Sequence, residues 1–352
     1  MQIITGLKDN HSHTLNEAGS YEKWYFDGID EENEYSFVII FYKGNPHSAE
    51  YNARVNDHLA NPDSKKPDPL NFCALSFDIY LKSRIIYRVF FEYAKNKFSA
   101  VPHDGGQRIY LDKSNFYLDK SENKYYININ FSTSDLENKF KAEFIFSMKS
   151  DGTEVSNNNN NSGTKHYWAP SAPICDFIGK FKLYKNFKRR KTDFEGFGYL
   201  DTAWGDEPMF NDIEQRYWGR VISNEYSVVY TYINYKDKSK ADFKKILIYQ
   251  HGNLILDKDD FEIKIKNSKN IWFLNYGKDL TITAGDFKFN TKNEVKVDSG
   301  PAYMRFHSCN NLFLKNKSVM TNVTGISDYF NPEKILSGFM SSYASKRIVR
   351  ID

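Results

Sequence analysis

Alternation of apolar and polar residues with a period of two is the dominant pattern along the chain. In YYININF (125–131), Ile127, Ile129 and Phe131 fall on one side and the two asparagines between them on the other. This is the period of a strand with one buried face. Other segments alternate in the same way or are rich in β-branched and aromatic residues, as strands are: 35–42, 75–81, 142–148, 226–235, 245–249, 261–266 and 279–289.

Turn signals separate these predicted strands. QHGNL (250–254) and MKSDGTEV (148–155) predict hairpin turns. The polar run SNNNNNSG (156–163) predicts a flexible loop. Only the C-terminal region favours a helix, because NPEKILSGFMSSY (331–343) begins with Asn-Pro and carries an acid in its first turn.

These patterns predict an all-β protein built from many short strands. A length of 352 residues suggests two domains, and a hydrophobic fraction of 40% allows each to bury a core. We expect two β-barrel domains, with residues 1–185 in the first and residues 186–352, including a short C-terminal helix, in the second.

The overall charge gives no argument for a nucleic-acid partner. The 48 basic and 45 acidic residues leave a net charge of +3. Five of the seven residues from 185 to 191 are basic. We interpret this run as a solvated linker, with a phosphate or membrane-headgroup site as the alternative.

Cysteine usage and the termini point to a soluble cytoplasmic protein. Cys73, Cys175 and Cys309 are odd in number and widely spaced, which argues against a disulfide framework or a zinc site. The N-terminus lacks the basic and apolar segments of a signal peptide. No apolar stretch approaches the ~20 residues that a membrane span requires.

Motifs for cofactor or metal chemistry are absent from the sequence. There is no Gly-rich phosphate loop, serine elbow or metal-spaced His/Cys cluster. HSH (11–13) offers two imidazoles. Because it lies near the terminus, we interpret this pair of histidines as incidental and not as a metal site. We therefore expect no cofactor and no metal, which leaves cofactor-free chemistry or plain binding.

Aromatic residues are the unusual feature of the composition. Phe, Tyr and Trp make up 16% of the chain, and such an interior suits apolar ligands and cationic intermediates. Three patches concentrate them near polar groups: EKWYFDG (22–28), HYWAPSAP (166–173) and GFGYLDTAWGDEP (196–208). Each patch also has a purely structural interpretation. The first would be the first strand of a barrel and its corner, the second a proline-bounded edge strand, and the third a turn stabilised by its aspartate.

The last two patches combine into a site for acid catalysis. His166 and Trp168 share a face of an extended segment, as do Tyr199 and Asp201. Enclosure by aromatic rings disfavours a charged carboxylate, so the acid can stay protonated and act as a general acid. Indole faces stabilise a developing carbocation, and the tyrosine and histidine could hold a water or pass a proton.

The order of these motifs resembles the carotenoid 1,2-hydratase (hydroxyneurosporene synthase) family, within a superfamily of double lipocalin-like proteins. The matching pieces run along nearly the whole chain: WYFDG (24–28), FYKGNP (41–46), HYWAP (166–170), GYLDTAWGDEP (198–208), YWGRV (217–221), and the C-terminal YFNP (329–332), its helix and the closing arginines. The combination of the N-terminal and central motifs is more specific than either motif alone.

The resemblance implies a cofactor-independent hydro-lyase that protonates the terminal double bond of an acyclic carotenoid and adds water. Asp201 then resembles the proton donor, with Tyr199, His166 and Trp168 as its companions between the two domains. We expect four further aromatic residues to bind the substrate: Trp24, Tyr25, Trp204 and Trp218. The partner is an apolar isoprenoid or polyene, reached in the cytoplasm or by peripheral contact with the inner face of the cytoplasmic membrane.

The environment of the acids is also predictable. A working acid at Asp201 should be largely enclosed and without an Arg or Lys partner. Asp206 and Glu207 should instead cap backbone amides or pair with a base such as Arg216 or Arg220. An elongated, aromatic-lined cavity should lie beside His166 and Trp168.

Two departures from the family pattern bear on water capture. Thr202-Ala203 stands where a Ser-Asn or His-Asn pair is expected, and Trp218-Gly219-Arg220 replaces Asp-Trp-Ser-Arg. Ala203 cannot hold a water by a side-chain hydrogen bond. A terpene or polyene cyclase, or a pericyclase, is therefore one alternative function, and a non-catalytic lipocalin-type binder of apolar molecules is another.

Overall fold

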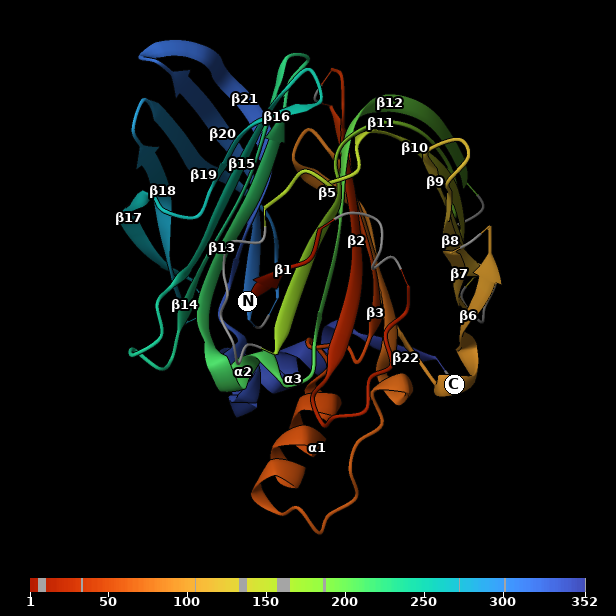
Figure 1. Cartoon of the computed structure of the whole chain (residues 1–352). Coiled ribbons are helices and arrows are strands. Elements are labelled where there is room, and N and C mark those ends of the chain that lie inside the picture. Colours follow the sequence, from red (N-terminus) through yellow and green to blue (C-terminus); the bar gives the residue numbers. More distant parts are fainter. Residues whose placement is uncertain are drawn as a thin grey trace.

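Two curled β-sheets lie side by side in the computed structural model of the chain (Figure 1). The structure describes residues 1–5, 11–32, 34–104, 106–132, 138–156, 165–185, 188–271, 273–300 and 302–351. The all-β prediction is confirmed, and most segments predicted as strands lie within one strand. The exception is 279–289, predicted as a single strand, which contains the end of one strand, the turn at Gly285 and Asp286, and the start of the next.

The first sheet contains thirteen of the described strands, in the order β22-β5-β4-β3-β2-β12-β11-β10-β9-β8-β7-β6, with β1 paired to β11. Neighbouring strands are antiparallel except at β1 and β22, which run parallel to their partners. The strands are β1 (Gln2–Ile3), β2 (Tyr21–Asp30), β3 (Tyr35–Lys43), β4 (Cys73–Leu81), β5 (Arg84–Tyr93), β6 (Phe98–His103), β7 (Gly106–Leu111), β8 (Ser114–Asp119), β9 (Lys124–Ser132), β10 (Asn138–Ser150), β11 (His166–Lys185), β12 (Lys188–Gly205) and β22 (Val349–Ile351).

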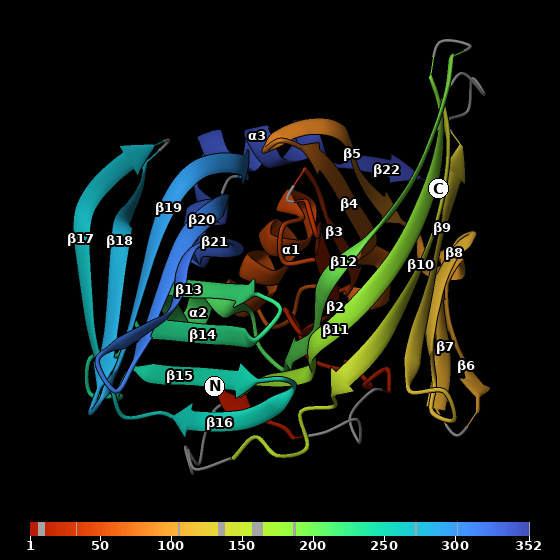
Figure 2. The ribbon, with the colours of Figure 1, turned by 90° about the horizontal axis from the view of Figure 1, so that it is seen from above.

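The second sheet is antiparallel and contains nine of the described strands, in the order β16-β15-β14-β13-β21-β20-β19-β18-β17. Seen from above, each sheet curls around its own interior (Figure 2). The strands are β13 (Ile213–Ile222), β14 (Tyr226–Tyr235), β15 (Phe243–Gln250), β16 (Asn253–Lys258), β17 (Glu262–Ile271), β18 (Leu274–Ala284), β19 (Phe287–Ser299), β20 (Tyr303–Leu314) and β21 (Lys317–Phe330).

Short helices join the two sheets. The turn after β12 and the single-turn α2 (Met209–Asp212) carry the chain into β13. After β21, η4 (Pro332–Leu336) and α3 (Gly338–Arg347) lead back to the first sheet, where β22 adds to β5 (Figure 2). Two further 3₁₀ turns are η2 (Pro69–Phe72) and η3 (Lys95–Lys97). The chain therefore crosses between the sheets twice.

The prediction that only the C-terminal region is helical was wrong. α1 (Ala49–Ala60) is a regular helix, capped by the Ser48 hydroxyl that accepts from the Tyr51 amide at 3.2 Å. The sequence of this helix is polar and contains asparagines, so it was not recognised as a helix. A capped helix with one face in solvent needs few regularly spaced apolar residues. At the C-terminus, the expected single helix is divided into η4 and α3.

The turn and boundary predictions have different outcomes. The 250–254 hairpin is confirmed, with His251 and Gly252 at φ 49° and 84°, as a two-residue turn requires.

The 156–163 run lies outside the described residues except for Ser156. The expected boundary at 185/186 falls between β11 and β12, which pair within one sheet, whereas the chain leaves that sheet only after Gly205.

Aromatic side chains fill the interior of the first sheet. Phe37 stacks on Phe144 with ring centroids 4.3 Å apart, and Phe26 contacts Phe116 at 5.1 Å. At Gly28 a Cβ atom would lie 2.5 Å from the Phe37 ring, so the glycine is needed for these rings to fit. Much of the unusual aromatic content therefore packs against itself.

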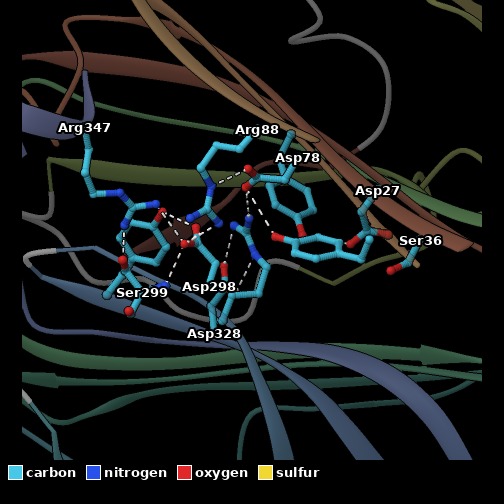
Figure 3. Close-up of polar contacts among 12 residues, drawn as sticks. Asp27, Ser36, Asp78, Arg88, Asp298, Ser299, Asp328 and Arg347 are labelled. Atoms are coloured by element: carbon cyan, nitrogen blue, oxygen red, sulfur yellow. Dashed lines mark hydrogen bonds and ion pairs between the residues drawn. The ribbon is translucent and has the colours of Figure 1, made fainter. Parts of the chain in front are cut away.

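A layer of buried charges lies where the two sheets face each other (Figure 3). Asp27 on β2 pairs with Arg220 on β13, and both side chains are buried. Arg88 on β5 bonds Asp78 at 2.8 Å within its sheet and reaches Asp298 on β19 at 2.5 Å. These ion pairs connect the sheets directly.

Additional polar contacts complete the layer. Arg305 on β20 holds Asp328 on β21 through two hydrogen bonds of 2.9 and 3.1 Å. His307 bonds Ser36 of the first sheet at 3.0 Å. Burial would raise the pKa of Asp298, but Arg347, Arg88 and Arg305 outweigh it and lower that pKa. The layer is thus a balanced network rather than a set of isolated charges.

We predict that breaking one inter-sheet pair destabilises the fold strongly. Arg220→Met leaves Asp27 buried without its cation, and removing one partner of a buried pair costs about 3–5 kcal/mol. Lys180→Met removes an exposed pair with Glu143 and should cost less than about 1 kcal/mol. Urea denaturation followed by tryptophan fluorescence measures both.

The double variant Asp27→Asn/Arg220→Met separates a charge effect from a packing effect. Because it leaves no uncompensated charge, it should recover a large part of the lost stability. Equal urea midpoints for Arg220→Met and Lys180→Met would contradict an essential inter-sheet pair.

Candidate active site

Adjacent strands β11, β12 and β2 place the candidate residues on the face that meets the second sheet. Asp201 lies directly opposite Tyr25, and Ala203 opposite Lys23. Trp168 lies opposite Ala203 on the other side of β12. Directly opposed residues share a face of a sheet, so these side chains meet in one place.

The Asp201 carboxylate is the centre of this arrangement. Its side chain is 1% exposed. The Trp168 indole Nε1 donates to Oδ2 at 2.8 Å, and the Tyr199 hydroxyl donates to the same oxygen at 3.0 Å. Burial, with the charge of Asp201, holds the pKa of Tyr199 well above its usual range, so its hydroxyl remains a donor. The structure therefore brings three of the four predicted catalytic residues into contact.

The prediction that Asp201 lacks a basic partner was wrong. Lys23 Nζ lies 3.6 Å from Asp201 Oδ1. Burial lowers the pKa of Lys23 to about 8, against the attraction of Asp201. Lys23 precedes the aromatic run in EKWYFDG, and the prediction considered only that run.

Two of the predicted substrate-binding aromatics also lie at this site. The Trp218 ring lies 5.2 Å from that of Tyr25 and 5.3 Å from that of Tyr199. Trp218 reaches them from β13, and so from the second sheet. These rings enclose the carboxylate from the side of the second sheet.

The other two predicted aromatics lie elsewhere. Trp24 points to the opposite face of β2 and packs against Phe116 inside the first sheet, at 5.6 Å. Trp204 stacks on His13 at 4.0 Å, on the face of β12 away from Asp201. The period of two explains both results, because each residue is one position away from a residue that faces the site.

His166 lies apart from the Asp201 carboxylate and contacts a different set of residues. Its Nδ1 is 3.1 Å from the Tyr21 hydroxyl, and its Nε2 is 3.9 Å from Glu207. Burial lowers the pKa of His166 to about 4, so the ring is neutral near pH 7. A neutral imidazole there can hold a hydrogen bond but does not deliver a proton.

His166 belongs to a polar cluster at the start of β13. His166, Glu207 and Asp212 each place a potential metal-ligand atom within 4.8 Å of the others, considering the residues that are described. Lys240 donates to Asp212 at 2.6 Å, and Lys165 lies 3.8 Å from Glu207. These lysines balance the charge of the carboxylates.

Glu207 was expected to pair with a base such as Arg216 or Arg220, and the base beside it is Lys165, at 3.8 Å. Arg220 pairs with Asp27 instead. Asp27 is a second buried carboxyl group close to Asp201, and the Tyr25 hydroxyl donates to it at 2.8 Å. Burial raises the pKa of Asp27, although Arg220 opposes the shift. Charged residues at a period of two in apolar strands, as in Arg216-x-Trp218-x-Arg220, were the signal in the sequence that the prediction missed.

A small cavity lies between the sheets beside Lys23. It provides about 50 Å³ for water-sized molecules, and about 600 Å³ when its mouth is included. Its wall mixes apolar residues such as Ile40 and Phe90 with Lys23, Arg216 and Arg305. Neither His166 nor Trp168 lines it, so it is not the elongated cavity expected beside them, although Tyr42, Phe90 and Phe330 contribute aromatic rings to its wall.

The fold and this enclosed carboxylate define a double lipocalin-like β protein with buried polar residues between its sheets. The chain belongs to the carotenoid hydratase CrtC family, whose model matches residues 121–323. The predicted family resemblance is therefore confirmed.

Two relatives extend the comparison. The hydroxyneurosporene dehydrogenase of Chlorobaculum tepidum is 25% identical over 357 residues, covering 99% of this chain and 92% of that protein. The acyclic carotenoid 1,2-hydratase of Thiocapsa roseopersicina is 24% identical over 204 residues, covering 57% of this chain and 44% of that protein.

Solved structures share the fold. CghA with Sch210972 superimposes with a TM-score of 0.56 at 10% identity, covering 93% of this chain and 94% of CghA. An AttH protein of Nitrosomonas europaea gives 0.55 at 12% identity, with 92% and 94% covered. Within the described residues, no helix is both long and apolar enough to cross a membrane.

We predict that His166 makes the fold acid-sensitive without titrating near neutrality. Its pKa is about 4 in the folded protein, against an ordinary value of 6.5. The stability it contributes is present above pH 6.5 and is lost as the pH falls toward 4. At about 1.4 kcal/mol per pKa unit, that contribution is about 3 kcal/mol.

The test compares the unfolding free energies of wild type and His166→Asn at pH 7.5 and pH 4.5. The advantage of wild type should shrink by about 2–3 kcal/mol at the lower pH. His251→Asn, at an exposed turn, should show no such change. An advantage independent of pH would show that folding does not lower the pKa of His166, which would contradict the prediction.

Proposed function

We propose that this protein hydrates the terminal double bond of an acyclic, carotenoid-like isoprenoid by acid catalysis, without a cofactor. The product is a tertiary alcohol. Membership of the CrtC family supports a carotenoid-modifying role. The carboxyl group of Asp201, in its protonated form, is the proposed proton donor.

The observation that carries the proposal is the enclosure of Asp201 between two aromatic donors and Lys23, which lines a water-sized cavity. Trp168 and Tyr199 both bond Oδ2, which orients the carboxyl group and leaves Oδ1 toward Lys23. A general acid held in this way requires little reorganisation during proton transfer.

The surrounding rings have a second role in the proposed reaction. Protonation of a trisubstituted alkene gives a tertiary carbocation, and aromatic faces stabilise it by cation–π attraction. Trp168, Tyr25 and Trp218 are buried rings that lie around the carboxylate. Because the cavity is only water-sized, entry of an isoprenoid end group requires it to widen.

Cyclisation is the second candidate, and it is favoured by one specific observation. Ala203, next to the site on β12, offers no hydrogen bond to a water molecule. A cyclase would use the same acid but would quench the cation with an internal alkene or by proton loss.

We predict that Asp201→Asn abolishes turnover. The amide keeps the size of the side chain but cannot deliver the proton, and general acid catalysis contributes roughly 10²- to 10⁴-fold in rate. Purified protein is incubated with lycopene-type and linear prenyl substrates, and products are followed by mass spectrometry. Hydration adds the mass of one water, whereas cyclisation leaves the mass unchanged at a new retention time.

Two other aspartates provide comparisons. Asp176→Asn changes an exposed carboxylate and should retain full activity. Asp27→Asn changes the second buried carboxyl group. Turnover by Asp201→Asn within a few-fold of wild type, with loss in an Asp27→Asn protein that tryptophan fluorescence shows to be folded, would assign the acid to Asp27 instead.

A further inference from the structure

Lys23 connects the Asp201 carboxylate to the cavity. It lines the cavity, and its ammonium lies 3.6 Å from Asp201 Oδ1. Asp201 itself does not line the cavity. We propose that Lys23 is a further catalytic residue, which supplies the proton that Asp201 gives to the alkene and then accepts the proton of the attacking water. This inference rests on the proposed hydration.

The hydrogen bonds around Asp201 leave one oxygen for this exchange. Both Trp168 and Tyr199 donate to Oδ2. Oδ1 is buried and receives no hydrogen bond from the residues that the structure describes. Lys23 is the cation beside it, and catalytic hydrogen bonds are often long before substrate binds. A contraction of less than about 1 Å would bring the pair to about 2.6–3.2 Å, the range for proton transfer.

The charges facing Lys23 allow it to be a proton carrier rather than a fixed cation. Asp201 and Asp328 attract its charge, whereas Arg216 and Arg305 repel it. Tyr25 and His47 also face the same cavity, and the pKa of His47 is lowered to about 3 by burial, so that ring is neutral. The net result of burial and these charges is a pKa of about 8 for Lys23.

The proposed cycle balances. The Lys23 ammonium first passes a proton to Asp201 Oδ1, which gives a neutral amine and a carboxylic acid. Asp201 then protonates the alkene, so a C–H bond forms and the π bond breaks to leave a tertiary cation. A water attacks this cation and loses one proton to the Lys23 amine. The product is the tertiary alcohol, and the Lys23–Asp201 pair returns to its starting charges.

The position of the cavity explains where this water is held. About 50 Å³ has room for a few water molecules, since one water needs only about 10–15 Å³ by this kind of measure. Lys23 and Arg216 are polar groups that can bond them from the wall. Water capture therefore does not require a hydrogen-bonding side chain at Ala203.

Two substitutions distinguish proton transfer from a purely electrostatic role. Lys23→Met removes both charge and proton, and Lys23→Arg keeps the charge but cannot release a proton at neutral pH. We expect both variants to lose about 10²-fold or more in kcat. Wild-type kcat should fall above about pH 8, where Lys23 loses the proton that starts the cycle. The residual rates of the variants should lack this decline.

Control measurements separate a loss of chemistry from a loss of folding or of substrate binding. Lys180→Met, at an exposed site, should retain wild-type kcat and its pH profile. Urea midpoints and quenching of tryptophan fluorescence by the isoprenoid measure folding and binding for each variant. Should Lys23→Met fail to fold, Lys23→Arg and the wild-type pH profile decide the question.

The results for the Lys23 variants can be told apart from a failure of the proposed hydration. Near-wild-type kcat in Lys23→Arg, or a wild-type rate that is flat through about pH 8, would overturn the role of Lys23. If Lys23→Met is active while Asp201→Asn is inactive, the hydration proposal stands without Lys23. If both variants are active, the proposed use of Asp201 fails as well.

Discussion

The buried ion pair between Asp27 and Arg220 is the interaction on which the arrangement of the two sheets depends. It joins β2 to β13, the strands that carry the Asp201 neighbours Tyr25 and Trp218. A buried charge is tolerated only with a partner, so the registers of both strands are constrained by this pair. The direct partners of Asp201 all lie in the first sheet, and the contact between the sheets adds Trp218 from the second sheet.

The protein has two kinds of buried surface, the apolar interiors of the sheets and the charged layer between them. The interiors of the sheets are filled by aromatic and aliphatic side chains, including the Phe37–Phe144 stack. Carboxylates and guanidinium groups gather instead in the layer between the sheets (Figure 3). Lys23 is buried beside this layer, next to Asp201. Low polarity around the layer shifts the titration of Lys23, His166 and Asp27 toward their neutral forms. Chemistry by proton transfer is favoured in such a layer and not inside the sheets.

The sequence predicted the strands and the central contacts because both depend on local spacing. Period-two alternation identifies which residues share a face, and it placed Tyr199 with Asp201 correctly. It does not tell which of the two faces meets the other sheet. For that reason Trp24, buried inside the first sheet, was assigned to the site, and its neighbour Lys23 was not. The helix α1 was missed because its capping by Ser48, rather than an apolar stripe, marks its start.

Isotope labelling of the product tests the central claim, acid-catalysed addition of water between the two sheets, most directly. The protein is incubated with an acyclic carotenoid in deuterated water that contains oxygen-18, and the product is analysed by mass spectrometry and NMR. Hydration by this route predicts one carbon-bound deuterium at the protonated carbon and one oxygen-18 at the neighbouring tertiary carbon. A product with carbon-bound deuterium but no oxygen-18, or one that has lost two hydrogens, would contradict it.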